Sequence, residues 1–195
     1  MAERTSTRSN GRASRRAFLD ATAVLLRRQG YAGTGLSEIV ARSGAPRGSL
    51  YFHFPGGKQE LARAAMERSG EQLRRAIGAT MDAPGGPRAA ILALLDALAA
   101  GLEGSGYRDG CPIATVALET AAESEPLRET AAAVFESWVD ELARALQDSG
   151  MERAGAQRRA LFVLSAIEGA LLLSRARRDV APLRAVREEL LLGLG

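Results

Sequence analysis

Glycine and proline residues divide the first sixty positions of this chain into three short helical segments. Apolar residues recur at spacings of three and four over residues 14–30, and glycine ends that run as it commonly ends a helix. A second helix fits residues 36–43 before Gly44, and a third fits residues 47–54 before Pro55. Three short helices joined by tight turns are typical of a helix-turn-helix.

The helical period continues through the rest of the chain and breaks clearly at the Pro- and Gly-rich stretch 83–87. The further helices expected cover residues 58–80, 88–103, 125–147 and 156–178, with a last one that opens at Pro182. The glycine-rich stretch 101–110 predicts a loop. No alternating segment is long enough to indicate a strand. The sequence therefore predicts an all-α fold of about nine helices without an internal repeat.

Charge is distributed unevenly. Residues 1–58 hold ten Lys or Arg and three Asp or Glu, a net charge of +7, whereas residues 59–195 hold sixteen and twenty, a net charge of −4. This asymmetry favours a polyanion as the partner of the first part, although a solvated basic tail would give the same charge. We expect a disordered basic arm at 1–13, a helix-turn-helix domain at 14–58 and a second domain at 59–195.

The chain offers little of the chemistry that enzymes and metal sites need. Cys111 is the only cysteine, so an intramolecular disulfide is excluded, and His53 is the only histidine, so any catalytic triad would have to use it. We expect neither an enzyme nor a metal or other cofactor. No apolar run reaches the roughly 20 residues of a membrane span, and the first ten residues lack the apolar stretch of a signal peptide. A cytoplasmic protein is expected.

The third helical segment carries the side chains expected to read DNA bases. Arg47 can donate two hydrogen bonds to guanine, Phe52 offers an apolar surface to a thymine methyl, and Gly48 lets the backbone approach DNA closely. Ser49 adds a donor at the same end of the helix. The opposite face is apolar and should form a core of Leu50 and Phe54 with Phe18, Ile39 and Val40.

Contacts to DNA phosphates are expected from Tyr51, His53 and Lys58. Lys58 also lies at a helix N-terminus, where backbone N–H groups favour anions. Other roles remain open at this stage. Tyr51 and Phe52 could be packing residues, His53 a plain surface histidine, and the arginines of the arm a solvated group without a contact in the minor groove: Arg12, Arg15 and Arg16.

Many of these positions resemble the N-terminal signature of TetR-type repressors. The matching residues are Gly30, Tyr31, Thr34, Glu38, Ile39, Gly44, Gly48, the run 50–54, Lys58 and Leu61. The resemblance implies phosphate contacts by Tyr51, His53 and Lys58, and it places Thr34 among the DNA-binding residues, beside the backbone at the start of the second helix. Gly35 and Pro46 depart from the family pattern, which commonly has serine or threonine caps there.

A second resemblance lies further along the chain. Residues 110–119, together with residues 55–58, look like a subgroup of TetR-type proteins that includes the lincomycin-resistance repressor and flavonoid-responsive repressors. TetR-type C-terminal domains commonly enclose an effector site and dimerise through their last two long helices. The resemblance therefore implies a small-molecule effector and a homodimer.

The segment 161–173 is apolar on nearly every face, so it must be buried on both sides. One side can face its own domain, and the simplest partner for the other is the same helix of a second subunit. A helix buried only within its own chain is the alternative. Small residues and the leucine stripe of the last helix give the expected interface: Ser165, Ala166, Gly169, Ala170, Leu173, Leu183, Val186 and Leu190.

Effector-binding candidates lie between these regions. Phe135 and Trp138 share one helix face and form either core or a pocket wall, while Cys111 and Thr115 follow the glycine-rich loop and could border the same cavity. Glu168 must pair with an arginine across the interface or point into the cavity.

The sequence thus predicts a dimeric repressor that binds a pseudo-palindromic operator in double-stranded DNA and is released by a small, mostly apolar effector. A DNA-binding protein that responds to no ligand is the alternative.

Overall fold

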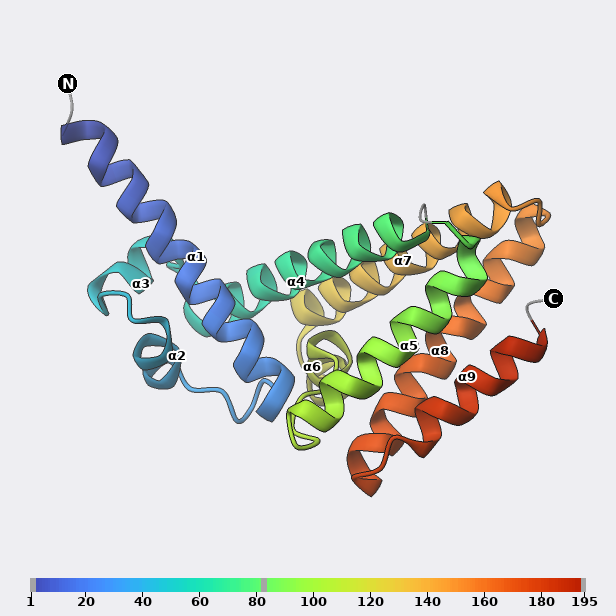
Figure 1. Ribbon diagram of the computed structural model, residues 1–195. Coiled ribbons are helices and arrows are strands. Elements are labelled where there is room, and N and C mark those ends of the chain that lie inside the picture. Colours follow the sequence, from blue (N-terminus) through green and yellow to red (C-terminus); the bar gives the residue numbers. More distant parts are fainter. Residues whose placement is uncertain (1–2, 82–83, 194–195) are drawn as a thin grey trace. The chain divides into compact units, whose positions relative to one another are not determined.

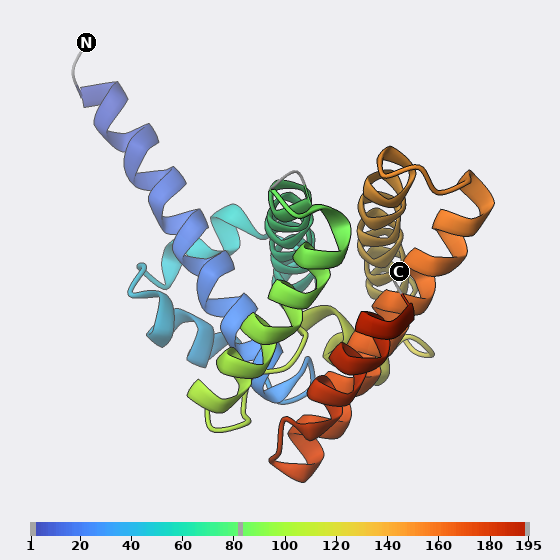
Figure 2. The same ribbon diagram turned by 45° about the vertical axis from the view of Figure 1, so that its right-hand side comes forward.

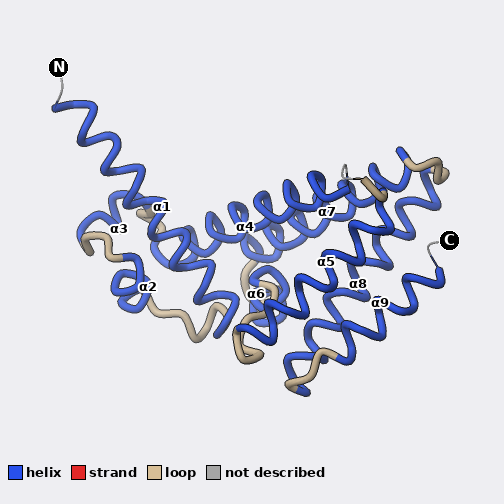
Figure 3. The backbone as a smooth tube through the Cα atoms, in the orientation of Figure 1, coloured by secondary structure: helices blue, strands red, loops and turns tan. Residues whose placement is uncertain are grey.

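The computed structural model describes residues 3–81 and 84–193, and every regular element within these ranges is a helix (Figure 3). The helices are α1 Glu3–Gln29, α2 Leu36–Ser43, α3 Gly48–His53, α4 Gly57–Met81, α5 Gly86–Gly104, α6 Pro112–Thr120, α7 Glu125–Asp148, α8 Arg153–Arg177 and α9 Ala181–Gly193. The predicted all-α fold is confirmed, and α2 has the predicted bounds. Helix α6 lies where no helix was predicted, and α5 extends into the predicted loop 101–110.

Helix α1 begins at Glu3, well before the start expected at residue 14. Residues 3–13 therefore continue the helix instead of forming a disordered arm, and residues 1–2 of that arm lie outside the described residues. This stretch has no apolar stripe. Because helical period is recognised from apolar residues, the pattern could not reveal this part of α1.

The chain divides into two compact units that differ from the predicted domains. Unit 1 comprises Met1–Ser69 with Pro112–Ala131, and unit 2 comprises Gly70–Cys111 with Ala132–Gly195. The sequence placed a boundary after residue 58, whereas the two units divide α4 after Ser69. Helix α6 belongs to unit 1, because it packs on α1 and buries two of its apolar side chains, Ile113 and Val116, completely.

The core of unit 1 joins α1 to the two short helices beside it (Figure 1). Phe18, Ile39, Leu50 and Phe54 are all at most 1% exposed. The rings of Phe18 and Phe54 meet edge to face with 6.5 Å between their centroids. Burial of each such side chain stabilises the fold by about 1.5–3 kcal/mol, so this predicted cluster fixes the orientation of α3. Val40 is only half-buried.

Unit 2 contains α5, α8 and α9, which contact one another, and α8 and α9 run side by side (Figure 2). Leu183 and Leu190 are 1% and 2% exposed, and Ala170 of α8 is 3% exposed. These three residues, expected at a subunit interface, lie in the core of their own unit, because the leucine stripe of α9 packs onto α8 and α5. In the described ranges, no helix has the length and apolar content of a membrane span.

Candidate functional site

Helix α3 and the residue before it expose the side chains predicted to read bases. Phe52 is 82% exposed and Tyr51 is 60% exposed, and Arg47 and Gly48 are exposed beside them. Leu50 occupies the buried face of the same helix. A phenylalanine this exposed is not a core residue, so the packing role that the sequence left open for Phe52 is removed. Together with the exposed Tyr51, it forms an aromatic surface of the kind that meets a partner.

The turn that leads into α3 binds the Ser49 hydroxyl. Gly44 ends α2 in the left-handed conformation with a φ of 63°, which glycine adopts without strain. The Ser49 hydroxyl and the Ser49 N–H both donate to the carbonyl of Pro46, at 2.7 and 2.9 Å. Pro46 thus supplies an acceptor at the start of α3, and the Ser49 hydroxyl is engaged within the protein.

Thr34 lies away from the exposed surface. It is 1% exposed, and its hydroxyl donates to the carbonyl of Gly30 at 2.6 Å. The threonine therefore fastens the turn between α1 and α2, and its hydroxyl hydrogen is used within the protein. A threonine before a helix can cap forward or bond back to an earlier carbonyl, and the sequence does not distinguish these geometries.

Lys58 and His53 are both half-buried at the edge of the exposed surface. The Lys58 ammonium lies 4.4 Å from the centroid of the Tyr31 ring and 3.5 Å from the carbonyl oxygen of Ala32. The His53 ring meets the Phe52 ring edge to face at 5.1 Å between centroids. An ammonium has three donors, so these contacts leave Lys58 able to bind a phosphate.

The arginines of the predicted arm lie on α1. Arg15 places its guanidinium carbon 5.3 Å from the centroid of the Phe54 ring, and Arg16 pairs with Asp20 at 3.5 Å. Arg12 is exposed. The helix places these cations on one element of the unit that carries α3.

Unit 2 has a cavity of about 680 Å³ between α7 and α8. Its lining includes the apolar residues Phe135, Val139, Leu161 and Leu164 and the acidic residues Glu136, Asp140 and Glu168. No lysine or arginine lines it. Two of the five predicted effector-binding residues, Phe135 and Glu168, are therefore brought together here. Such a volume suits a small organic molecule.

Glu168 lines the cavity. The sequence had left open whether it does so or pairs with an arginine across a subunit interface. Burial raises the pKa of this carboxyl above its usual range, and a hydrogen bond with the Cys111 side chain opposes that rise. Cys111 thus reaches a cavity residue without lining the cavity itself. Thr115 belongs to α6 of unit 1 and does not line this cavity.

Trp138 is a core residue and not part of the cavity wall. It is 2% exposed, and its indole N–H donates to the carbonyl of Gly70 at 2.9 Å. Its ring meets that of Phe135 edge to face, with 5.6 Å between centroids. The predicted pair is therefore split: Phe135 faces the cavity, and Trp138 lies directly behind it.

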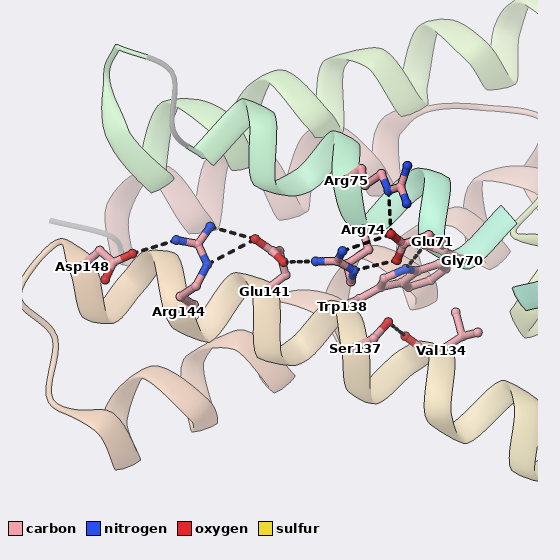
Figure 4. A network of polar contacts seen from close by, with 10 residues as sticks. All are labelled: Gly70, Glu71, Arg74, Arg75, Val134, Ser137, Trp138, Glu141, Arg144 and Asp148. Carbon is pink, nitrogen blue, oxygen red and sulfur yellow. Dashed lines mark hydrogen bonds and ion pairs between the residues drawn. The ribbon is translucent and has the colours of Figure 1, made fainter. Parts of the chain in front are cut away.

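An ion-pair network fastens α7 to the last half of α4 within unit 2 (Figure 4). Arg74 binds Glu71 at 2.8 Å and Glu141 at 2.6 Å, and Arg144 binds Glu141 at 2.7 Å and Asp148 at 2.9 Å. Hydrogen bonds from Arg74 and Arg75 lower the pKa of Glu71 to about 2. One wall of the cavity is thus attached to α4, the helix that continues into unit 1.

A row of apolar and small residues lies exposed on α8. Phe162, Leu172 and Leu173 are 57%, 57% and 55% exposed, and Ser165 and Gly169 lie exposed between them. A Cβ atom added to Gly169 would meet nothing within 4 Å. Ala166 of α8 and Val186 of α9 are half-buried. The spacing of three and four residues places this row on one helix face, and an exposed apolar face marks an interaction site. Because segment 161–173 is apolar on nearly every face, its sequence alone does not distinguish this exposed face from the buried one.

Comparison with known proteins assigns both parts of the chain. Residues 18–65 match the model for "Bacterial regulatory proteins, tetR family", and residues 87–189 match "Transcriptional regulator LmrA/YxaF-like, C-terminal domain". The HTH-type transcriptional regulators LmrA and YxaF of Bacillus subtilis are 38% and 37% identical to this chain. These alignments cover 87% and 91% of this chain, and 90% and 93% of the relatives.

Solved structures show the same fold. E. coli NemR in its reduced form superposes with a TM-score of 0.81 at 22% identity, covering 91% of this chain and 94% of that chain. A TetR regulator from Chloroflexus aurantiacus superposes with a TM-score of 0.73 at 27% identity, covering 92% of this chain and 93% of that one. The family and its members are transcriptional regulators and not enzymes. The chain belongs to the TetR family of bacterial transcriptional regulators, with a C-terminal domain of the LmrA/YxaF type.

Proposed function

We propose that this regulator is a homodimeric repressor that binds a pseudo-palindromic operator through α3 and leaves it when a small, mostly apolar effector binds. It acts in the cytoplasm, where bacterial DNA lies. The observation that carries the DNA-binding part is the exposed surface of α3 and the residue before it, where Phe52 is 82% exposed and Tyr51, Gly48 and Arg47 are also exposed. Side chains of these types on a short exposed helix suit the major groove.

Roles within the interface follow from the chemistry of each side chain. Arg47 reads a guanine, Phe52 contacts a thymine methyl, and Gly48 allows close approach of the helix. Tyr51 and Lys58 contact phosphates, which orient the helix but carry no sequence information directly. His53, half-buried against Phe52, adds a phosphate contact from the edge of the surface.

The exposed row on α8 supports the dimer. A monomer would leave Phe162, Leu172 and Leu173 more than half exposed to water, and a second copy of the same face covers them. Gly169 in the middle of this row lets the two α8 helices approach closely. A two-fold dimer presents two reading helices to two half-sites, which is the reason for a pseudo-palindromic operator.

The cavity between α7 and α8 supports the effector. Phe135 and the aliphatic lining favour an apolar, preferably aromatic body. The three carboxylates disfavour an anionic ligand such as a sugar phosphate, because no lysine or arginine lines the cavity to neutralise it. Release requires that the effector binds better to a conformation whose two recognition helices no longer match the operator.

Separate changes of Arg47 and Lys58 test the DNA-binding roles. Arg47→Ala should lower the affinity for the best operator by about 1–3 kcal/mol and relax the base preference at one position of each half-site. Lys58→Ala should weaken all duplexes alike and reduce the slope of log K against log [salt] by about one unit. The measurement is fluorescence anisotropy on selected and scrambled duplexes at several salt concentrations. The roles are wrong if Lys58→Ala changes sequence preference while Arg47→Ala does not.

Trp138 emission tests the effector site, because the ring lies behind the cavity residue Phe135. A library compound that shifts this emission should also lower operator affinity, since coupling between two binding sites is reciprocal. Phe135→Ala should weaken that compound about tenfold or more, while operator affinity without the compound stays within about twofold.

Leu118→Ala serves as the control for this measurement, because it removes an equally apolar side chain that is 74% exposed on α6 and does not line the cavity. A compound that releases DNA equally well from the Phe135→Ala variant would place the effector elsewhere. If no compound changes DNA affinity, the regulator acts without a ligand.

A further inference from the structure

Glu119, near the end of α6, reaches the turn between α1 and α2. Its carboxylate accepts a hydrogen bond from the N–H of Ala32 at 2.8 Å, a contact between residues 87 positions apart. Gly30 opens this turn with a φ of 74°, and a Cβ atom there would lie 1.6 Å from a carboxylate oxygen of Glu119. The glycine is needed both for the backbone conformation and for the space that the carboxylate occupies.

The other side of the same turn touches Lys58. Its ammonium lies over the Tyr31 ring, 4.4 Å from the centroid, and 3.5 Å from the carbonyl oxygen of Ala32. Ala32 is therefore contacted through its N–H by a carboxylate and through its carbonyl by an ammonium. Two internal hydrogen bonds stiffen the turn: Thr34 to the Gly30 carbonyl at 2.6 Å, and Gln29 to the Gly33 carbonyl at 2.8 Å.

Helix α6 is a firm support for this contact. Ile113 and Val116 are fully buried, and Thr120 is 5% exposed with its hydroxyl bound to the Val116 carbonyl. Because α6 packs on α1, the position of the Glu119 carboxylate is fixed relative to the turn that it holds.

We propose that Glu119 is a positioning residue for DNA binding: by holding Ala32 it fixes the turn on which Tyr31 and the Lys58 ammonium rest, and so keeps Lys58 within reach of a phosphate. The inference rests on the proposed phosphate contact of Lys58. A long lysine side chain loses much rotamer freedom when it binds, and a platform that restricts it beforehand lowers that loss.

The sign of the effect separates this role from simple electrostatics. Glu119 is an anion in the unit that meets DNA, so its removal would strengthen binding if only its charge mattered. The positioning role predicts weaker binding. Glutamine retains an oxygen that can accept from the Ala32 N–H but carries no charge, whereas aspartate retains the charge but is one methylene too short to keep the contact.

The experiment measures the affinity of the full-length protein for a duplex that the unchanged protein selects from a random-sequence library. Glu119→Ala and Glu119→Asp should each lower affinity about three- to tenfold, and Glu119→Gln should remain within about twofold. Glu123→Ala is the matched control, because it removes an exposed carboxylate four positions further along. It should bind equally well or slightly more tightly. Circular dichroism confirms that each variant is folded, and Glu119→Asp decides the test if Glu119→Ala is not.

A double-mutant cycle with Lys58→Met tests whether Glu119 affects DNA binding through Lys58. If Glu119 acts through Lys58, Glu119→Ala should have little further effect on affinity in the Lys58→Met background. Equal effects in both backgrounds, or tighter binding by Glu119→Ala, would overturn the inference. Lys58→Met alone tests the proposed function separately. If it changes neither affinity nor salt dependence, the phosphate contact is wrong, and with it the role given to Glu119.

Discussion

Replacing Gly169 with leucine should convert the proposed dimer into a monomer and lower operator affinity by about a hundredfold or more. Gly169 lies in the middle of the exposed row on α8, and a side chain there has open space within its own chain. The variant therefore folds normally, while the added leucine collides with the partner's α8. A monomer binds one half-site and loses the effective concentration of the second, which is worth roughly 10²–10⁴ in affinity.

Light scattering at micromolar concentration checks the oligomeric state, with a dimer mass of twice the 20.6 kDa chain expected for the unchanged protein. Gly101→Leu is the matched control: Gly101 is also an exposed helical glycine with nothing within 4 Å of an added Cβ, but it lies on α5. Both changes should raise local helix stability by about 1 kcal/mol, so a difference in mass reports the interface alone. An unchanged protein that is monomeric, or a Gly169→Leu variant that remains dimeric, would contradict the close approach of α8.

The elements that the sequence predicted well are those with strong local signals. Gly44 ends α2 at the predicted residue because only glycine adopts its left-handed conformation without strain. Leu50 and Phe54, four residues apart, were predicted to lie on one apolar side, and both are 1% exposed, whereas Phe52 and Arg47, the residue before α3, are exposed. Helical periodicity separates Phe52 from Leu50, but it does not account for the exposure of Arg47, which precedes the first turn of α3.

The errors concern choices that only tertiary packing makes. On α8, apolar residues occupy nearly every face, so the sequence did not show that Ala170 faces inward while Leu172 and Leu173 face outward. The same ambiguity assigned Leu183 and Leu190 to an interface, although α9 needs both to pack on its own unit.

Contacts between distant residues also left no signal in the sequence. Glu119 meets Ala32 across 87 positions of the chain. Its helix, α6, was not predicted, because its short apolar run follows a glycine-rich stretch and lacks a clear period. The role of such a carboxylate shows only when its partner is known, and that partner is set by packing.

Trp138→Ala should be strongly destabilising, lowering the free energy of unfolding by about 3–5 kcal/mol. The indole is 2% exposed and fills the space beside Gly70, where α4 and α7 approach so closely that a Cβ on Gly70 would lie 2.6 Å from a methyl carbon of Val134. Removal of the ring leaves a cavity and removes the hydrogen bond that the indole donates to the Gly70 carbonyl. Urea unfolding followed by circular dichroism measures the loss.

Trp138→Phe separates the two contributions, because it keeps most of the ring volume but removes the N–H donor, and it should cost about 1–3 kcal/mol. Phe135→Ala provides the contrast: this half-buried ring borders the cavity, so its removal should cost less stability and should instead weaken the effector. If Trp138→Ala left stability unchanged but abolished effector binding, Trp138 would be a pocket wall and the contact with Gly70 incidental. Because the indole joins α7 to α4, as the Arg74–Glu141 ion pair does, its loss should also weaken the link between the cavity wall and α4.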